Sequence, residues 1–259
     1  MARERVRLEV EDGVGLVTVD RPEVLNALDA RTLEELDQVI GEVERGAARA
    51  IVLTGAGDRA FVAGADLSAM EGMGPAEALA FAERGHALFD RLERLAGPTI
   101  AAVNGFALGG GSELALACDL VYASPQARFG QPEVNLGIIP GFGGTQRLPR
   151  RIGPMRALEI LLTGAPVDAA RARELGLVLD VLPLEKLVAH ARAVARTILS
   201  RGPLAIAAVK RLVRAGADLP LAEAKTLERE AFAKLFASGD TQEGIRAFLE
   251  KRPPRFTGS

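Results

Sequence analysis

The first twenty residues alternate between apolar and polar positions in two runs that are separated by a turn. Val6, Leu8 and Val10 are spaced by polar residues, Asp12-Gly13 follows, and an apolar run resumes over residues 15–19. Successive side chains of a strand point to opposite faces, so this pattern predicts two strands joined by a turn.

The next segment changes to a helical period. Asp29 is a good N-cap, because its carboxylate can accept a hydrogen bond from the first helical turn. Behind it, apolar residues recur three and four positions apart, at Leu33, Leu36, Val39, Ile40 and Val43. Two continuous apolar runs, 50–54 and 99–103, then predict buried strands, and the segment near 75–95 predicts a helix between them.

The rest of the chain divides into two parts. A short helix from about Ser112, a strand near 120–123 and an extended piece at 128–130 continue the alternation, which predicts α/β layers with crossover connections. From Pro154 onward, amphipathic segments rich in alanine and leucine predict helices near 155–163, 184–200, 204–215, 219–237 and 241–250. We therefore expect an α/β core over 1–200 and a helical C-terminal part over 201–259.

Composition and charge narrow the class of protein. The 259 residues are 48% hydrophobic and 25% charged, as in an ordinary globular chain. A formal net charge of −2 and a pI of about 5.9 leave no basic field to hold RNA or DNA, so we expect no nucleic-acid partner. Cys118 is a lone cysteine, and His86 and His190 lie far apart, so we expect neither a disulfide nor a metal site.

Targeting and membrane segments are also not predicted. The start, MARERVRLEVEDG, has no apolar stretch of the kind found in a secretory signal. The longest apolar run, 99–123, contains Asn104, Glu113 and Asp119, which does not predict a membrane span. We expect a cytoplasmic protein that acts on small molecules and has no membrane partner.

Glycines are concentrated in one region of the chain. Nine of the 28 glycines lie within residues 105–144. Among them, Gly109-Gly110-Gly111 follows an apolar strand and precedes a helix-like segment. A glycine turn that opens a helix points free N–H groups and the positive end of the helix dipole into one small space. The pattern indicates an anion or oxyanion site, and tight turns alone are the alternative.

Three other motifs are weaker. Gly55-Ala56-Gly57-Asp58-Arg59-Ala60 follows a buried strand and matches a dinucleotide fingerprint, but the residues after it do not continue as a clear helix. No lysine follows a glycine loop as in a phosphate-binding loop. Gly111-Ser112-Glu113 lacks the second glycine of a nucleophile elbow, which disfavours a serine hydrolase.

Two glutamates lie close to the glycine-rich segments. Glu113 falls in the first turn of the predicted short helix, and Glu133 follows Pro132, whose fixed backbone would aim it. Two carboxyl groups in apolar surroundings raise each other's pKa and can share acid and base roles. The alternative is that Glu113 is a helix-start charge and Glu133 an exposed loop charge, and spacing alone leaves both interpretations open.

Several segments, taken in order along the chain, resemble the enoyl-CoA hydratase/isomerase (crotonase) family. They are Arg21-Pro22 with Asn26-Ala27-Leu28, the segment FVAGADL at 61–67, IAAVNGFALGGGSELAL at 100–116, FGQPEVNLGIIPGFGGTQRL at 129–148, and Glu243-Gly244 with AFLEKR at 247–252. The resemblance covers essentially the whole chain, and several motifs in register make it specific.

The resemblance implies a fold and a substrate class. The fold is α/β, a spiral core of repeated ββα turns with a helical C-terminal region that forms trimers, two of which commonly pair into a hexamer. The substrate is an acyl-CoA thioester, and two backbone amides, which correspond to Ala65 and Gly110, hold its carbonyl oxygen. Coenzyme A is part of the substrate, so we expect no separate cofactor and no metal.

The resemblance also places residues around the substrate. Backbone near Ala63, Asp66 and Leu67 would lie beside the CoA adenine, and Arg59 would approach the CoA phosphates. Leu25 and Phe142 would shape the acyl pocket. The pocket would be completed, often from a neighbouring subunit, by Phe232, Phe248 and Lys251.

Within the family, this chain is similar to the hydratases, which carry both glutamates. We therefore expect an enoyl-CoA hydratase in which Glu113 and Glu133 are the acid and base. A Δ3,Δ2-enoyl-CoA isomerase or another crotonase-type reaction is the alternative within the fold. A non-catalytic acyl-CoA-binding or RNA-binding relative is the alternative from another class.

A few residues with reactive or charged side chains receive no functional assignment. We expect His86 and His190 to be surface or packing residues and Cys118 to be a small buried hydrophobe. Three arginines at 147, 150 and 151 are expected to be helix-terminal charges.

Overall fold

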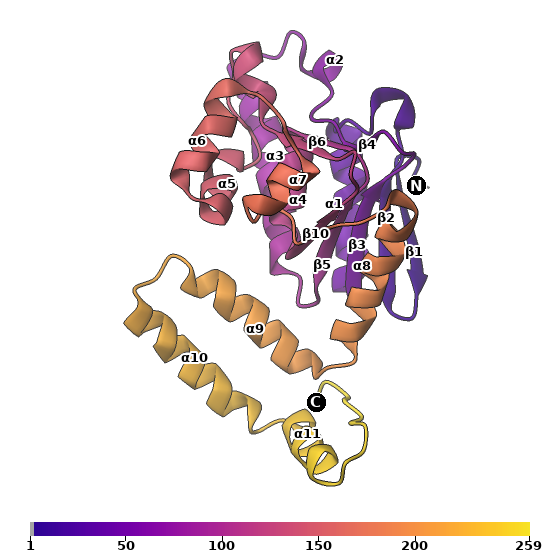
Figure 1. Ribbon diagram of the computed structural model, residues 1–259, viewed down its shortest axis with the longest axis vertical. Coiled ribbons are helices and arrows are strands. Elements are labelled where there is room, and N and C mark those ends of the chain that lie inside the picture. Colours follow the sequence, from indigo (N-terminus) through magenta and orange to yellow (C-terminus); the bar gives the residue numbers. More distant parts are fainter. Residues whose placement is uncertain (1–2) are drawn as a thin grey trace.

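The computed structural model describes residues 3–259, and Figure 1 shows their path. The strands are β1 (Val6–Glu11), β2 (Val14–Val19), β3 (Ala50–Gly55), β4 (Ala60–Val62), β5 (Thr99–Val103), β6 (Phe106–Leu108), β7 (Leu120–Ala123), β8 (Arg128–Gly130), β9 (Val167–Asp168) and β10 (Asp180–Val181). The helices are η1 (Pro22–Val24), α1 (Ala30–Glu44), α2 (Leu67–Met70), α3 (Pro75–Arg94), α4 (Gly110–Ala117), η2 (Pro132–Leu136), α5 (Gly144–Ile152), α6 (Pro154–Thr163), α7 (Ala169–Glu174), α8 (Leu184–Leu199), α9 (Pro203–Gly216), α10 (Leu221–Leu235) and α11 (Gly239–Leu249).

The described strands form two sheets that are built by a repeated ββα turn. The larger sheet has the order β1-β2-β3-β5-β7-β10, and the smaller one has the order β4-β6-β8-β9. Each repeat adds one strand to each sheet and then a helix: β3 and β4 precede α3, β5 and β6 precede α4, and β7 and β8 precede η2 and α5. Equivalent strands of successive repeats pair in parallel. The expected α/β fold with a spiral of ββα turns is confirmed.

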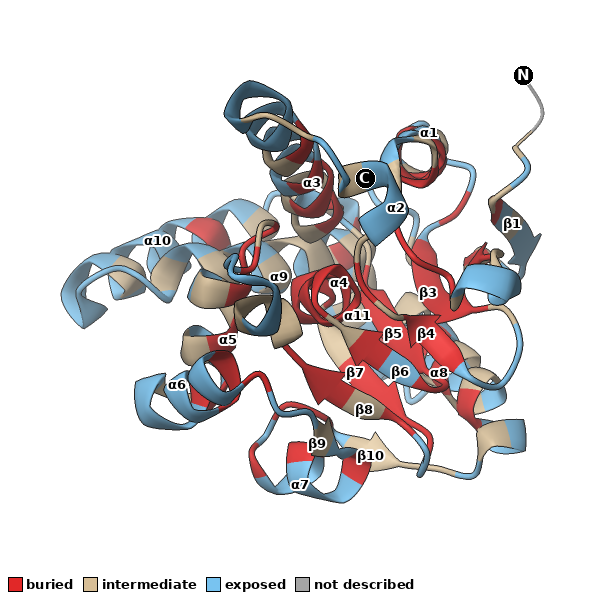
Figure 2. Cartoon of the chain, turned by 90° about the horizontal axis from the view of Figure 1, so that it is seen from above, coloured by how far each residue is buried: buried red, intermediate tan, exposed pale blue. Residues whose placement is uncertain are grey.

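The buried apolar residues form two clusters. The larger one packs the sheets against α1, α3 and α4, and Figure 2 shows α4 and the central strands as its buried centre. The smaller one packs the larger sheet against α8. All eight residues of α4 are buried, which explains its composition of small and apolar residues around Glu113. This helix packs against β6, α3 and α5. It starts at Gly110, two residues earlier than predicted, because Gly109 takes a positive φ of 48° and closes the turn.

Helices α9, α10 and α11 form an arm that lies apart from the sheets (Figure 1). Every residue of α9 is at least partly exposed, and the arm displays large apolar side chains, among them Val209, Val213, Leu221, Phe232, Phe236, Ile245, Phe248 and Leu249. The helices predicted after residue 154 are present. The predicted boundary at residue 200 falls between α8 and α9, and the division into 1–200 and 201–259 stays a prediction. Within residues 3–259, no helix is long and apolar enough to span a membrane.

The glycine loop that resembled a dinucleotide fingerprint has another structure. Gly55–Ala60 leads from β3 into β4 rather than into a helix, so it presents no helix N-terminus to a phosphate. Its carbonyls point inward instead: Asn104 Nδ2 donates to the carbonyl oxygens of Gly55, Gly57 and Ala60 at 3.0, 2.9 and 3.1 Å. The dinucleotide alternative is therefore wrong.

Candidate active site

Glu113 lies in the first turn of α4 with 1% of its surface exposed. Its Oε1 atom accepts hydrogen bonds from the backbone N–H groups of Phe142 and Gly144, at 2.8 and 2.6 Å. Both donors come from the glycine-rich turn that leads into α5. Two donors on one oxygen fix the carboxyl group and leave Oε2 available for a further interaction.

Burial raises the pKa of Glu113 to about 7. The two backbone donors, at Gly144 and Phe142, oppose this shift because they bind the ionised form. The negative charge of Glu133 raises the pKa of Glu113 further, so Glu133 acts electrostatically on Glu113. A buried carboxyl group with a pKa near neutrality can accept and return a proton at physiological pH.

Glu133 enters from a different element. It is the second residue of η2, where Pro132 occupies the first turn and fixes the approach of the chain. It is partly buried, and burial raises the pKa of its carboxyl group. A Cβ atom at Gly109 would lie 2.7 Å from Glu133 Oε1, so the carboxylate sits against the turn that opens α4. Glu133 thus lies at a helix start directly after Pro132.

Gln131 is a neighbour of Glu133 that the sequence did not single out. Its side chain is buried, with 1% exposure. In the amide orientation that satisfies both its oxygen and its nitrogen, the nitrogen donates to Glu133 Oε1 and Oε2 at 3.2 and 3.3 Å. In the sequence, the available signal was a glutamine two positions before the glutamate.

Two backbone N–H groups on turns close to Glu133 have no acceptor within the described residues. Neither the Ala65 nor the Gly110 amide makes a hydrogen bond within residues 3–259. The Gly110 amide belongs to the first residue of α4, whose dipole favours negative charge there. The turns that carry the two amides are neighbours, because a Cβ atom at Gly109 would lie 3.8 Å from Gly64 Cα. Two N–H donors on neighbouring turns are the kind of groups that can hold an oxyanion, and this role stays a prediction.

The chain around Ala65 is held by its own hydrogen bonds. Leu28 pairs with it in parallel, donating to Gly64 O and accepting from Asp66 N, both at 2.8 Å. The Asp66 carboxylate caps α2 and pairs with Arg21 at 3.0 Å. The backbone groups that bond to Leu28 are thus those of Gly64 and Asp66, on either side of Ala65. The N–H of Ala65 itself takes no part in this pairing.

The remaining predicted contact residues have varied surroundings. Ala63 and Leu25 are partly buried, Leu67 and Arg59 are exposed, and Phe142 is buried against Phe81 and Phe89 with ring centroids 5.2 and 5.6 Å away. A Cβ atom at Gly110 would lie 3.2 Å from the Phe142 ring, which therefore borders the candidate oxyanion site. Their roles toward a ligand stay predictions.

Phe232, Phe248 and Lys251 lie on or next to the exposed arm (Figure 1), and the structure does not bring them to the two glutamates of the same chain. Phe232 and Phe248 are 64% and 83% exposed. A contribution of these residues to the site of a neighbouring subunit stays a prediction.

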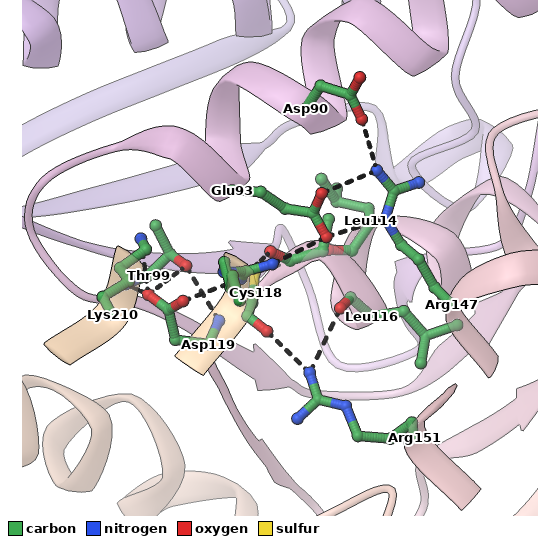
Figure 3. A network of polar contacts seen from close by, with 12 residues as sticks. Asp90, Glu93, Thr99, Leu114, Leu116, Cys118, Asp119, Arg147, Arg151 and Lys210 are labelled. Carbon is green, nitrogen blue, oxygen red and sulfur yellow. Dashed lines mark hydrogen bonds and ion pairs between the residues drawn. The ribbon is translucent and has the colours of Figure 1, made fainter. Parts of the chain in front are cut away.

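The interpretation of Arg147 as a helix-terminal charge is wrong. Arg150 and Arg151 do lie in the last turn of α5, but the Arg147 side chain is only 13% exposed and belongs to a partly buried network of polar contacts (Figure 3). Arg151 also donates to the carbonyl oxygens of Leu116 and Cys118 at 3.3 and 3.0 Å (Figure 3).

The other unassigned residues behave as expected. Cys118 is buried, and burial raises the pKa of its thiol to about 12. His190 packs edge-on against Tyr122 with ring centroids 4.7 Å apart, and His86 is exposed. In the described part of the chain, no three His, Cys, Asp or Glu side chains form a group that could hold a metal ion.

Comparison with known proteins gives consistent matches over nearly the full length. The family model described as enoyl-CoA hydratase/isomerase matches residues 9–259. A short-chain-enoyl-CoA hydratase of Clostridium acetobutylicum is 46% identical over 253 residues, which is 97% of each protein. A crotonyl-CoA hydratase of Syntrophomonas wolfei is 43% identical over 257 residues, or 99% of each. A crystal structure of enoyl-CoA hydratase from Bacillus anthracis superposes with a TM-score of 0.95 at 38% identity, covering 99% of this chain and 100% of the other.

Proposed function

The chain belongs to the enoyl-CoA hydratase/isomerase family, and we propose that it is an enoyl-CoA hydratase, which adds water reversibly and with syn geometry to a trans-2-enoyl-CoA. The product is a 3-hydroxyacyl-CoA. One observation carries the proposal: Glu113 and Glu133 are arranged beside two backbone N–H groups, of Ala65 and Gly110, that have no acceptor within residues 3–259.

The two amides stabilise the negative charge that develops during the reaction. The C2=C3 bond is conjugated with the thioester carbonyl, so attack of water at C3 moves negative charge through C2 onto the thioester oxygen. Donors from Ala65 and Gly110 stabilise this enolate-like oxygen where the charge develops. Each such donor contributes roughly 3–4 kcal/mol in comparable sites.

The two carboxyl groups move the protons. Glu113, with Oε1 held by two amides, uses Oε2 to orient and deprotonate the water whose oxygen bonds to C3. Glu133 delivers a proton to C2. The two groups interact electrostatically, so the acid and base assignments can exchange between them.

The remaining assignments follow from the same proposal. Coenzyme A enters as part of the substrate, and the reaction uses no other cofactor and no metal. The relatives named as short-chain and crotonyl-CoA hydratases favour a short acyl chain. The arm's exposed apolar side chains fit a trimer or a hexamer in which Phe232, Phe248 and Lys251 complete a neighbour's CoA pocket. We place the enzyme in the cytoplasm.

The test is an assay with crotonyl-CoA that follows loss of the conjugated enoyl-thioester absorbance. Tyr122 is the lone tyrosine and the chain has no tryptophan, so the protein adds little ultraviolet background. We expect a fast decrease that yields 3-hydroxybutyryl-CoA. A double bond shifted without water, assayed with a 3-enoyl-CoA, would identify the isomerase instead. Binding of acyl-CoA without turnover of crotonyl-CoA or longer enoyl-CoA substrates would contradict the proposal.

A further inference from the structure

Arg147 links the turn that holds Glu113 to a pair of acidic residues on α3. Its Nη1 atom donates to the carbonyl oxygen of Phe142 at 2.6 Å. Its Nε and Nη2 atoms bind the two oxygens of Glu93 at 2.9 and 3.0 Å, and Nη2 also binds Asp90 at 2.9 Å (Figure 3). The guanidinium group is therefore fixed by carboxylates on one side and holds a backbone carbonyl on the other.

The carbonyl that Arg147 holds belongs to the same residue whose N–H holds Glu113. Phe142 donates to Glu113 Oε1 through its amide and accepts from Arg147 through its carbonyl. Gly143 follows with a φ of 103°, and a side chain there would overlap Arg147 Nη1, so the arginine lies directly over the turn. Gly144 then provides the second donor to Glu113. Since glycines leave this turn intrinsically free to move, its geometry depends on groups outside it.

Building on the proposed function, we propose that Arg147 is a positioning residue for Glu113: it fixes the 142–144 turn whose two amides orient the carboxyl group, and Glu93 is the anchor that keeps it there. Neither residue has to touch the substrate. Loss of either should misplace the carboxyl group and slow the chemical step while leaving acyl-CoA binding intact.

Glu93, the anchor of Arg147, also binds the C-terminal arm. Arg214 of α9 places Nη1 2.9 Å from Glu93 Oε1, and its Nη2 atom lies 2.8 Å from Asp119. Lys210, one helical turn earlier, pairs with Asp119 at 2.8 Å. These groups line a cleft of about 1250 Å³ between α9 and the core. The Glu93 carboxylate thus binds both Arg147 of α5 and Arg214 of the arm.

The experiment compares Arg147→Gln and Arg147→Lys with Arg150→Gln as the matched control. Arg150 is on the same helix, is 55% exposed and pairs with Asp218 outside the site. For Arg147→Gln we expect kcat with crotonyl-CoA to fall roughly 10-fold to 100-fold with KM changed less than twofold, as for a misplaced reacting group. Arg147→Lys should recover part of kcat, and Arg150→Gln should retain it.

A second readout needs no activity. The pH dependence of the free energy of unfolding, measured with and without Glu113→Gln, reports the pKa of Glu113. The charged groups acting on Glu113 are Arg147 from α5 and Glu133 from η2, and His86 of α3 lies near the turn at Gly143. We expect the Glu113 pKa to rise in Arg147→Gln, because the cation that lowers it is gone, and to stay close to the wild-type value in Arg147→Lys.

The outcomes separate the two proposals. An active wild type with an Arg147→Gln variant of unchanged kcat and unchanged Glu113 pKa overturns the positioning role alone. A wild type without hydratase activity overturns the proposed function, and the Glu113 pKa still tests the contact with Arg147. If Arg147→Gln does not fold, Arg147→Lys and Glu93→Gln carry the test, and wild-type kcat in both would contradict the inference.

Discussion

Gly144 donates its backbone N–H to Glu113 Oε1 at 2.6 Å, across 31 positions of the sequence. The bond joins the start of α5 to the first turn of α4 and is one of two that hold this oxygen. Burial disfavours the ionised carboxyl group, whereas the two donors favour it. These opposing effects leave the pKa of Glu113 at about 7, so both protonation states are accessible near neutral pH.

Replacing either glutamate by glutamine should remove most of the hydratase activity. Glu113→Gln and Glu133→Gln keep the size of the side chain but cannot transfer a proton, so we expect kcat to fall about 10²-fold to 10⁴-fold in each. Acyl-CoA binding should persist, because the amides of Ala65 and Gly110 are unchanged. Steady-state kinetics with crotonyl-CoA and a binding titration with a saturated acyl-CoA measure both effects. Near-wild-type kcat in either variant would exclude the mechanism with two carboxyl groups.

The buried Glu113 should also make stability depend on pH in a defined direction. Its pKa is raised from 4.5 to about 7 in the folded protein, so the protonated group favours the folded state. This contribution is complete below about pH 4.5 and is lost as the pH rises through about 7. Relative to Glu113→Gln, the wild type should lose about 3 kcal/mol of unfolding free energy across that window. Urea denaturation at a series of pH values measures it, and parallel pH curves for the two proteins would contradict the assignment.

Most of the helices could be predicted because their apolar stripes are long and their caps are local. Asp29 accepts from Thr32 N at the start of α1, as a local N-cap should. The shortest strands could not be predicted in the same way. In β6, Phe106–Leu108, three residues are too few to show a period, and their pairing with β4 and β8 is a property of the spiral.

The candidate site was only partly accessible from local patterns. Glu113 and Gly110 stood out because they share one glycine-rich helix start, whereas Ala65 was identified only through the family resemblance, since its segment shows no distinctive local pattern. Arg147 was misinterpreted because two further arginines follow it in a short helix. Its burial depends on Glu93, 54 positions earlier, and no local pattern reports a contact at that separation.

Asn104 should be essential for the loop that connects β3 to β4. Its side-chain nitrogen donates to three backbone carbonyls, and its oxygen accepts from Gly55 N at 3.2 Å. The carboxylate of Asn104→Asp has no N–H to donate to those three carbonyls. We therefore expect this variant to lose about 3 kcal/mol or more of unfolding free energy. Asn135→Asp, at an exposed position of η2, is the control and should change stability by less than about 0.5 kcal/mol. Equal urea midpoints for the two variants would contradict this role.

Two glycines of the same region should differ sharply in their tolerance of a methyl group. A Cβ atom at Gly111 would overlap the carbonyl oxygen of Val62 in β4, and both residues lie in regular elements that cannot move apart without breaking the core. We expect Gly111→Ala to lose about 3 kcal/mol or to fail to accumulate as folded protein, which is the upper range for overpacking. Any folded fraction should also have reduced kcat, because β4 leads directly to Ala65. A Cβ atom at Gly141 would meet nothing within 4 Å, so Gly141→Ala should keep its urea midpoint and its activity. Equal urea midpoints for the two variants would contradict the claim that close packing of α4 on β4 requires glycine at position 111.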